Sequence, residues 1–285
     1  MPSTSQSRRM STRFLSMFKQ PGRGLRAGAC AGLLAIAAGA VGLPGASAAE
    51  AEALALLKGM TTYMAAQQTM SFRYDADFDV VTTQQQRLTL ASSGTVSLAR
   101  PGRIRSTRST GFADIETVFD GSTFTLLGKR ANVYMQVPFK GTIETLVDEL
   151  KDKYRRPLPA ADLLLPKAYA ELTEGVTDVK DLGSGVVGGV ECDHLAFRKK
   201  DVDFQIWIAQ GQRPYPCRYM ITSTTVPGSP QYRVQISNFQ TGSAAIGQSF
   251  TFVPPQGARA ISKDELKTIK SMVELPSHFT QGGTP

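Results

Sequence analysis

The chain has 285 residues, with 32 basic and 24 acidic side chains and a formal net charge of +8 at pH 7. The excess lies at the N-terminus, because residues 1–48 hold six basic residues and no acidic one, which leaves 26 basic and 24 acidic residues in the remainder. A remainder so nearly neutral removes the main argument for nucleic-acid binding, so we expect no nucleic-acid partner.

Residues 1–48 have the three parts of a secretory signal peptide. Basic residues are followed by the apolar run AGACAGLLAIAAGAVGL and then by the small residues of PGASAAE. We therefore predict cleavage after Ala48, export, and one domain over residues 49–285. A retained anchor is less favoured because the run is short for a membrane span. Arg8-Arg9 hints at twin-arginine export, and the sequence leaves the route open.

The first half of the mature chain predicts one helix and then an antiparallel meander. Good helix formers without proline predict the helix over residues 50–68. Asp120-Gly121 is a typical hairpin turn. Apolar and polar residues alternate, as in half-buried strands, in SFRYDADFDVV, QRLTLASSGTVSLARP, ETVFDGSTFTLLG and NVYMQVP.

The second half predicts helices and then further strands. LPAADLLLP (158–166) is too short to be a stable helix alone, so its leucines must pack on something. SKDELKTIKSMVEL predicts a C-terminal helix with a capping box of Ser262 and Glu265. A helical apolar stripe is formed by Ile143, Leu146, Val147, Leu150 and Tyr154. Strands are expected in VTDVKDLGSGVVGGVECDHLAF, VDFQIWIA, PCRYMITSTTV, QYRVQISNFQ and SFTFVPPQGARAI.

The tripeptide Cys192-Asp193-His194 raises the question of a chemical site. A metal site needs about three or four convergent ligands, and the other histidine of the mature chain is His278, near the C-terminus. A Cys-His nucleophile would also need an oxyanion hole and an activated thiol, and neither is visible. We therefore expect no metal, no cofactor and no catalytic residue, and hence no enzyme.

A disulfide between Cys192 and Cys217 is the structural alternative for these cysteines. They are the two that follow the leader, and the exported compartment is oxidising. However, a two-residue turn at Lys199-Lys200 would pair Leu195 with Phe204 and Cys192 with Trp207. It would leave Cys217 two strands away, at more than 9 Å or so, roughly twice the spacing of neighbouring strands. A bridge tolerates roughly 7 Å between Cα atoms. The strands would have to be adjacent, or their ends would have to curl together, so the bond stays open.

Two other motifs favour structural roles. GSGVVGG has the spacing of a dinucleotide-binding loop at Gly183, Gly185 and Gly188, but a strand follows it where a phosphate site needs a helix. RPGRIRSTR could bind polyanions or lipid headgroups, although a solvated strand face is favoured because acidic residues balance the mature chain. Its arginines are Arg100, Arg103, Arg105 and Arg108.

The order of helix, meander, inserted helices and further strands resembles the periplasmic lipoprotein carriers of the LolA/LolB type. The closest local match runs from Arg100-Pro101 at a strand end, through the Asp120-Gly121 turn, to Tyr134. Through ECDHLAF, VDFQIWI and FTFVPPQGA, the mature chain looks still more like a family of predicted periplasmic proteins, domain of unknown function 2092. The resemblance implies an α+β fold in which a curved antiparallel sheet, an incomplete β-barrel, wraps around helices.

The resemblance also implies an apolar cavity for the acyl chain of a lipid or a lipidated protein, with transient membrane contact. In the carriers the arginine before the proline holds a lid helix closed, so Arg100 is the implied latch and LPAADLLLP the implied lid. The alternatives are an envelope interaction module with a filled core and an envelope hydrolase with unidentified acidic residues; the oligomeric state stays open. Candidate cavity residues are Phe72, Tyr74, Phe78, Leu88, Leu90, Leu163, Leu164, Phe204, Ile206 and Ile208.

Overall fold

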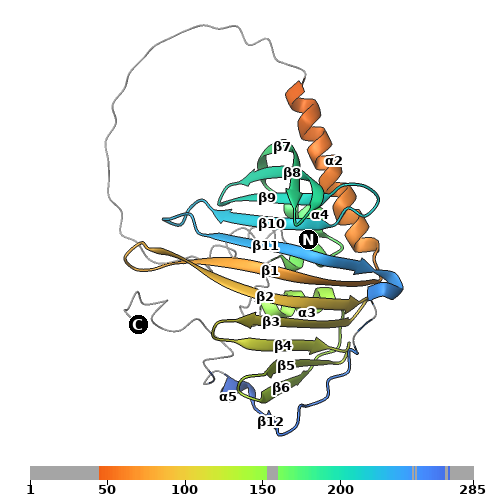
Figure 1. Ribbon diagram of the computed structural model, residues 1–285, viewed down its shortest axis with the longest axis vertical. Helices are drawn as coiled ribbons and strands as arrows, with labels where there is room; N and C mark the ends of the chain where they lie inside the picture. The colour runs from red at the N-terminus through yellow and green to blue at the C-terminus, as the bar shows by residue number, and fades with distance from the viewer. Residues whose placement is uncertain (1–44, 153–159, 246, 248, 267–268, 270–285) are drawn as a thin grey trace, which may run out of the picture.

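A single 12-stranded sheet organises the chain, in the order β12-β6-β5-β4-β3-β2-β1-β11-β10-β9-β8-β7 (Figure 1). The structure is a computed structural model that describes residues 45–152, 160–245, 247, 249–266 and 269. The short strand β12 runs parallel to β6, and all other neighbours are antiparallel. The sheet is not closed, because β12 and β7 are its two edges. The predicted fold class, an unclosed curved antiparallel sheet with few helices, is confirmed.

Two runs of hairpins make up the sheet. The first contains β1 (Thr69–Val81), β2 (Arg87–Ala99), β3 (Arg103–Thr110), β4 (Asp114–Phe119), β5 (Thr123–Gly128) and β6 (Val133–Pro138). The second contains β7 (Val176–Val187), β8 (Val190–Lys199), β9 (Val202–Ala209), β10 (Pro216–Ser223) and β11 (Gln231–Thr241). The two runs meet where β11 pairs with β1, so that Tyr74 lies opposite Ile236.

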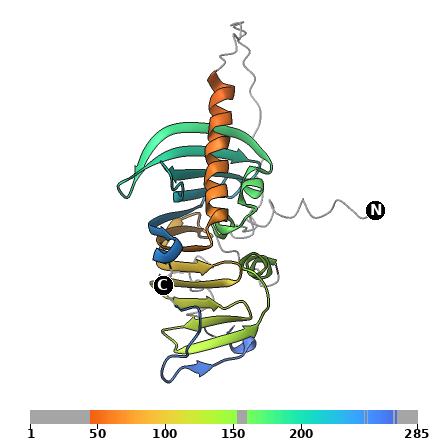
Figure 2. The same cartoon turned by 90° about the vertical axis from the view of Figure 1, so that its right-hand side faces the viewer.

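Helices lie against one face of this sheet, which we call the inner face (Figures 1 and 2). They are α2 (Gly45–Ala66), α3 (Ile143–Asp152), the 3-10 helix η3 (Ala161–Leu164) and α4 (Ala168–Thr173). The helix α2 contacts β7, β9, η3 and α4. Its buried apolar residues recur every three or four positions, as an amphipathic helix requires; they are Ala53, Leu57, Met60 and Met64.

The main core lies between α2, η3 and the inner face. The strands contribute side chains that alternate along each strand, because successive residues point to opposite faces. This main core includes Met70, Phe72, Leu98, Leu195, Phe197, Phe204, Ile206, Ile208, Tyr219, Ile221 and Val234. In the part of the chain that the structure describes, none of the helices combines the length and apolarity needed to cross a membrane.

The hairpin of β8 and β9 has a different register from the one predicted. Leu195 lies opposite Ile206, and Cys192 lies opposite Ala209. The predicted partners, Phe204 and Trp207, are wrong because the two-residue connection between the strands lies at residues 200–201, one position further along the chain than the expected turn. A shift of two residues leaves every side chain on its expected face.

Two other segments differ from the sequence prediction, and a third is described only in part. SFTFVPPQGARAI forms only β12 (Arg259–Ala260), since its adjacent prolines have no N–H to donate to a sheet. The helix α4 was not expected. The C-terminal helix is described as α5 (Lys263–Leu266), and its capping box is confirmed by hydrogen bonds of 3.1 Å and 3.0 Å between Ser262 and Glu265. Tyr154, His278 and the predicted signal peptide up to residue 44 lie outside the described residues.

Candidate functional site

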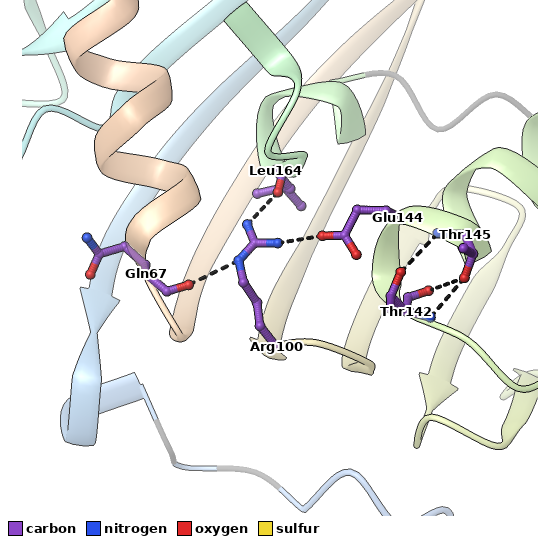
Figure 3. A network of polar contacts seen from close by, with 6 residues as sticks. All are labelled: Gln67, Arg100, Thr142, Glu144, Thr145 and Leu164. Carbon is purple, nitrogen blue, oxygen red and sulfur yellow. Dashed lines mark hydrogen bonds and ion pairs between the residues drawn. The ribbon is translucent and has the colours of Figure 1, made fainter.

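Arg100 lies at the end of β2 and joins three elements that are distant in the sequence (Figure 3). Its Nε donates to the carbonyl oxygen of Gln67, just after α2, at 3.1 Å. One Nη donates to Glu144 Oε1 in α3 at 2.8 Å, and the other donates to the carbonyl oxygen of Leu164 in η3 at 2.5 Å. The planar guanidinium presents fixed donors in several directions, so one side chain can hold all three elements.

The guanidinium of Arg100 is nearly enclosed, with only 8% of the side chain exposed, against 26% for Glu144. Burial lowers the pKa of Arg100, and the neighbouring Glu144 carboxylate opposes that shift. The pair therefore places a charged hydrogen-bond network between the helices and the sheet. Removing either partner leaves the other partly buried and uncompensated, which is the costly way to break an ion pair.

Local hydrogen bonds fix Glu144 in the first turn of α3. Thr142 and Thr145 cap each other, with 2.8 Å from Thr142 N to Thr145 Oγ1 and 3.3 Å from Thr145 N to Thr142 Oγ1 (Figure 3). The backbone N–H of Ile143 also donates to the carbonyl oxygen of Pro101, at 2.8 Å. The start of α3 is thus tied to the residue that follows Arg100, which brings the carboxylate to the guanidinium.

The predicted lid segment, as far as it is described from residue 160, lies on the main core. Leu163 and Leu165 are buried, and Leu164 is half-buried against the same core. Arg100 holds this segment through the backbone oxygen of Leu164, so the leucine side chain remains free to pack on apolar groups.

The ten predicted cavity residues fall into two groups. Phe72, Tyr74, Leu163, Leu164, Phe204, Ile206 and Ile208 belong to the main core or pack against it. The other three, Phe78, Leu88 and Leu90, are half-buried and are not part of this core. They lie towards the hairpin between β1 and β2, where Phe78 is opposite Leu90. The structure therefore does not bring all ten residues into one place.

Tyr74 crosses its neighbouring strand because residue 94 is glycine. A Cβ atom at Gly94 would lie 2.7 Å from Cζ of Tyr74 and would overlap the carbonyl oxygen of Thr107. Without that atom, the Tyr74 hydroxyl reaches over β2 and donates to the Thr107 oxygen at 3.0 Å. Burial raises the pKa of Tyr74. A glycine inside a strand was the sequence signal for this close approach, and sequence reasoning missed it.

The remaining arginines of RPGRIRSTR do not join the Arg100 site. Arg103 lies over the Phe250 ring, with 5.5 Å from Cζ to the ring centroid. Arg105 forms an ion pair with Glu116, and Arg108 is exposed. Of the four, Arg100 is the one that contacts the helices. Sequence reasoning missed Glu144 and Gln67 as its partners, since no motif links positions so far apart.

The three residues of Cys192-Asp193-His194 have separate environments. The His194 ring stacks on Trp207 at 4.0 Å between centroids, and its Nε2 lies 2.9 Å from Gln205 Oε1. Asp193 accepts a hydrogen bond from Gln210 at 2.7 Å. Cys192 is buried beside Cys217. Among the described residues, no group of three or more His, Cys, Asp or Glu side chains could hold a metal ion.

Comparisons with known proteins identify a family and several distant structural matches. A family model described as "Predicted periplasmic protein (DUF2092)" matches residues 53–263, which confirms the resemblance to that family and its periplasmic location. No curated protein matches the chain.

Among solved structures, LprF from Mycobacterium bovis is 12% identical with a TM-score of 0.43, and the match covers 71% of this chain and 97% of that one. An uncharacterized conserved protein from Thermus thermophilus is 10% identical with a TM-score of 0.40, covering 74% and 98%. A LolA superfamily protein from Nitrosomonas europaea is 10% identical with a TM-score of 0.23, covering 67% and 93%. The fold assignment therefore rests on the strand order of this chain.

Proposed function

This chain belongs to the DUF2092 family of predicted periplasmic proteins, and on that premise we propose that it binds an acyl chain, of a lipid or of a lipidated protein, on the inner face beneath η3. The observation that carries the proposal is the hydrogen bond from Arg100 to the Leu164 oxygen, which holds an apolar segment over the main core. The activity is reversible burial of the chain and requires no catalytic group.

Ligand binding in this scheme replaces the apolar side chains of the lid segment with the apolar acyl chain. In the closed state Leu163 and Leu164 pack on the main core, and Leu165 is buried next to them in the chain. In the ligand-bound state the segment swings away, and the acyl chain takes the place of these side chains against Phe204 and Ile206. The apolar side chains of the inner face give such a chain a mostly apolar surface.

Magnitudes favour a ligand with a long chain. A hydrogen bond to a charged group contributes about 1.5–3 kcal/mol, and uncovering a leucine costs about 1.5–3 kcal/mol. Releasing the Leu164 oxygen and uncovering Leu163 and Leu165 therefore costs about 5–9 kcal/mol. Each methylene buried contributes about 0.8 kcal/mol, so about 6 to 11 methylenes offset the opening. Short-chain acids are then predicted to be poor ligands.

Arg100 sets the threshold for opening in this scheme. Its contact with the Leu164 oxygen must break, while its bonds to Gln67 and Glu144 can stay. The guanidinium is thus never left without an acceptor during the exchange, which limits the cost of desolvating it.

Native mass spectrometry of the protein, exported to the periplasm and purified without detergent, tests the proposal. We expect an adduct of lipid mass on the wild type and a larger fraction of protein with the adduct in Leu164→Asp, because a carboxylate cannot rest on the apolar core and therefore lowers the cost of opening. Val186→Asp is the matched control, since Val186 is 69% exposed on the edge strand β7; it should leave the adduct fraction unchanged.

A spectrum that shows the polypeptide without an adduct, even after fatty acid and phospholipid are added, would contradict acyl-chain binding. That result would favour an interaction module with a filled core, since Leu163 is already 2% exposed.

A further inference from the structure

Cys192 in β8 and Cys217 in β10 meet across the strand that separates them. Their Sγ atoms are 2.7 Å apart, and the two residues are 0% and 1% exposed. Both are free thiols in the structure. We propose that in the exported protein these two sulfur atoms are joined as a disulfide that ties β8 to β10 across β9. This inference is independent of the proposed acyl-chain binding.

A bulge in β10 removes the geometric objection to this bond. Cys192 lies opposite Ala209, at the end of β9. The register between β9 and β10 shifts between Pro216 and Arg218, so Cys217 is the extra residue without a partner on β9. A bulge bends its strand and redirects the side chain of the extra residue. Because the intervening side chain is only the methyl group of Ala209, the two sulfur atoms can meet above β9.

The thiols are enclosed by an apolar cluster. Val187, Ala209, Val190, Trp207 and Tyr215 pack around the two cysteines. Burial raises the pKa of both thiols, so little thiolate is present in the folded protein. Since the thiolate is the reacting species, the pair is slow to react once β8, β9 and β10 have closed over it. The bond is therefore expected to form before the cluster is complete.

The chemistry is an ordinary thiol–disulfide exchange. One cysteine thiolate attacks a disulfide-bonded oxidant of the periplasm and forms a mixed disulfide. The second thiolate then displaces the oxidant, which leaves as a dithiol. Two protons and two electrons are removed from the cysteine pair, and one S–S bond is formed.

The bond would stabilise the end of the sheet next to the main core. It closes a loop that contains all of β9. It also fixes the bulge at the start of β10, which comes directly after Tyr215. The Tyr215 ring stacks on Phe239 of the main core, at 4.5 Å between centroids and 8° between planes. A disulfide here would hold this stack in place.

Thiol blocking followed by peptide mass spectrometry tests the proposal on the exported full chain. The protein is unfolded in denaturant with iodoacetamide and no reductant, and a parallel sample is reduced first. We expect a Cys192–Cys217 linked peptide and no label in the first sample, and two labels in the second. Full labelling of both cysteines without reductant overturns the proposal. Reading individual peptides keeps Cys30 of the predicted leader out of the result.

Thermal unfolding provides a second measurement. For a loop of this size in a domain of this length, reduction should lower the Tm of the wild type by about 5–15 °C. The double variant Cys192→Ala/Cys217→Ala should have the same Tm with and without reductant. If reductant leaves the wild-type Tm unchanged, or shifts that of the double variant equally, the proposed bond is contradicted even where the variant folds poorly.

Discussion

The guanidinium of Arg100 donates a 2.5 Å hydrogen bond to the backbone oxygen of Leu164, which lies 64 positions further along the chain. The acceptor is a backbone atom, so this contact depends on the arginine and not on the side chain at position 164. The side chain of Leu164 can therefore be changed to test what η3 covers, and Arg100 can be changed to test what holds η3 in place.

Replacing Arg100 with glutamine should loosen η3. The change removes the contacts to Gln67 and Leu164 and leaves Glu144 without its ion-pair partner, so we expect a loss of about 2–4 kcal/mol in unfolding free energy. Hydrogen exchange should speed up in residues 160–165. The matched control is Arg103→Gln on β3, which should alter neither quantity. Unchanged exchange in residues 160–165 of Arg100→Gln would refute the latch.

Glu144→Gln should cost less than the arginine change, at about 1 kcal/mol, because the amide oxygen can still accept a hydrogen bond from Arg100. A double-mutant cycle with Arg100→Gln, measured by urea unfolding, should give a coupling energy of about 0.5–3 kcal/mol. Additive effects of the two changes would show that the 2.8 Å ion pair contributes nothing to stability.

Gly94→Ala should destabilise the sheet by about 2–4 kcal/mol, since the added methyl group would displace the Tyr74 ring and the Thr107 carbonyl from their close approach. Gly59→Ala is the matched control. It lies within α2 with nothing within 4 Å of the added atom, so it should stabilise the protein by up to about 1 kcal/mol. Equal effects of the two changes in urea unfolding would contradict the packing described for Tyr74.

Stability should fall in alkali through the buried tyrosines. Burial raises the pKa of Tyr215 to about 12 and also raises the pKa of Tyr219 and Tyr232. A higher pKa in the folded state means that the folded state binds the proton more tightly. The contribution is therefore complete below the unfolded value of about 10 and is lost as the pH rises from there towards the folded values.

The alkaline prediction is checked by the Tm between about pH 9 and pH 12. We expect a steeper fall for the wild type than for Tyr219→Phe, which lacks one of the titrating groups. Tyrosinate absorbance that develops at the ordinary phenol pKa for all tyrosines, in a protein that is still folded, would show that these rings are not protected.

Local patterns in the sequence were sufficient to predict most strands. They were not sufficient to predict the contacts between segments that lie far apart in the sequence. The alternation from Phe72 to Val80 predicted β1 and its inner face, because burial of every second residue is visible in a short stretch of consecutive residues. The register of β8 and β9 depended on the position of one two-residue turn, which composition alone did not fix. The Cys217 bulge left no sequence signal, and so the meeting of Cys192 and Cys217 stayed open until the fold was known.

The candidate site was predictable only in part. The pairing of Arg100 with the segment around Leu164 came from the resemblance to the carriers, and the structure places the two in contact. Its partner Glu144 could not be found, because its position depends on how α3 docks beside Pro101. Phe78, Leu88 and Leu90 were grouped with the cavity because alternation identifies a face of a strand. It does not tell which end of that face the helices cover.

The pairing of β1 with β11 has a consequence for the order in which the exported chain folds. The hairpins from β1 to β6 need only neighbouring residues, so they can form as soon as that part of the chain has crossed the membrane. The other edge of β1 can pair only when residues 231–241 follow. Contacts between such distant segments form slowly, and an unpaired edge strand recruits other strands. The interval before β11 arrives is therefore when this protein is most prone to aggregate.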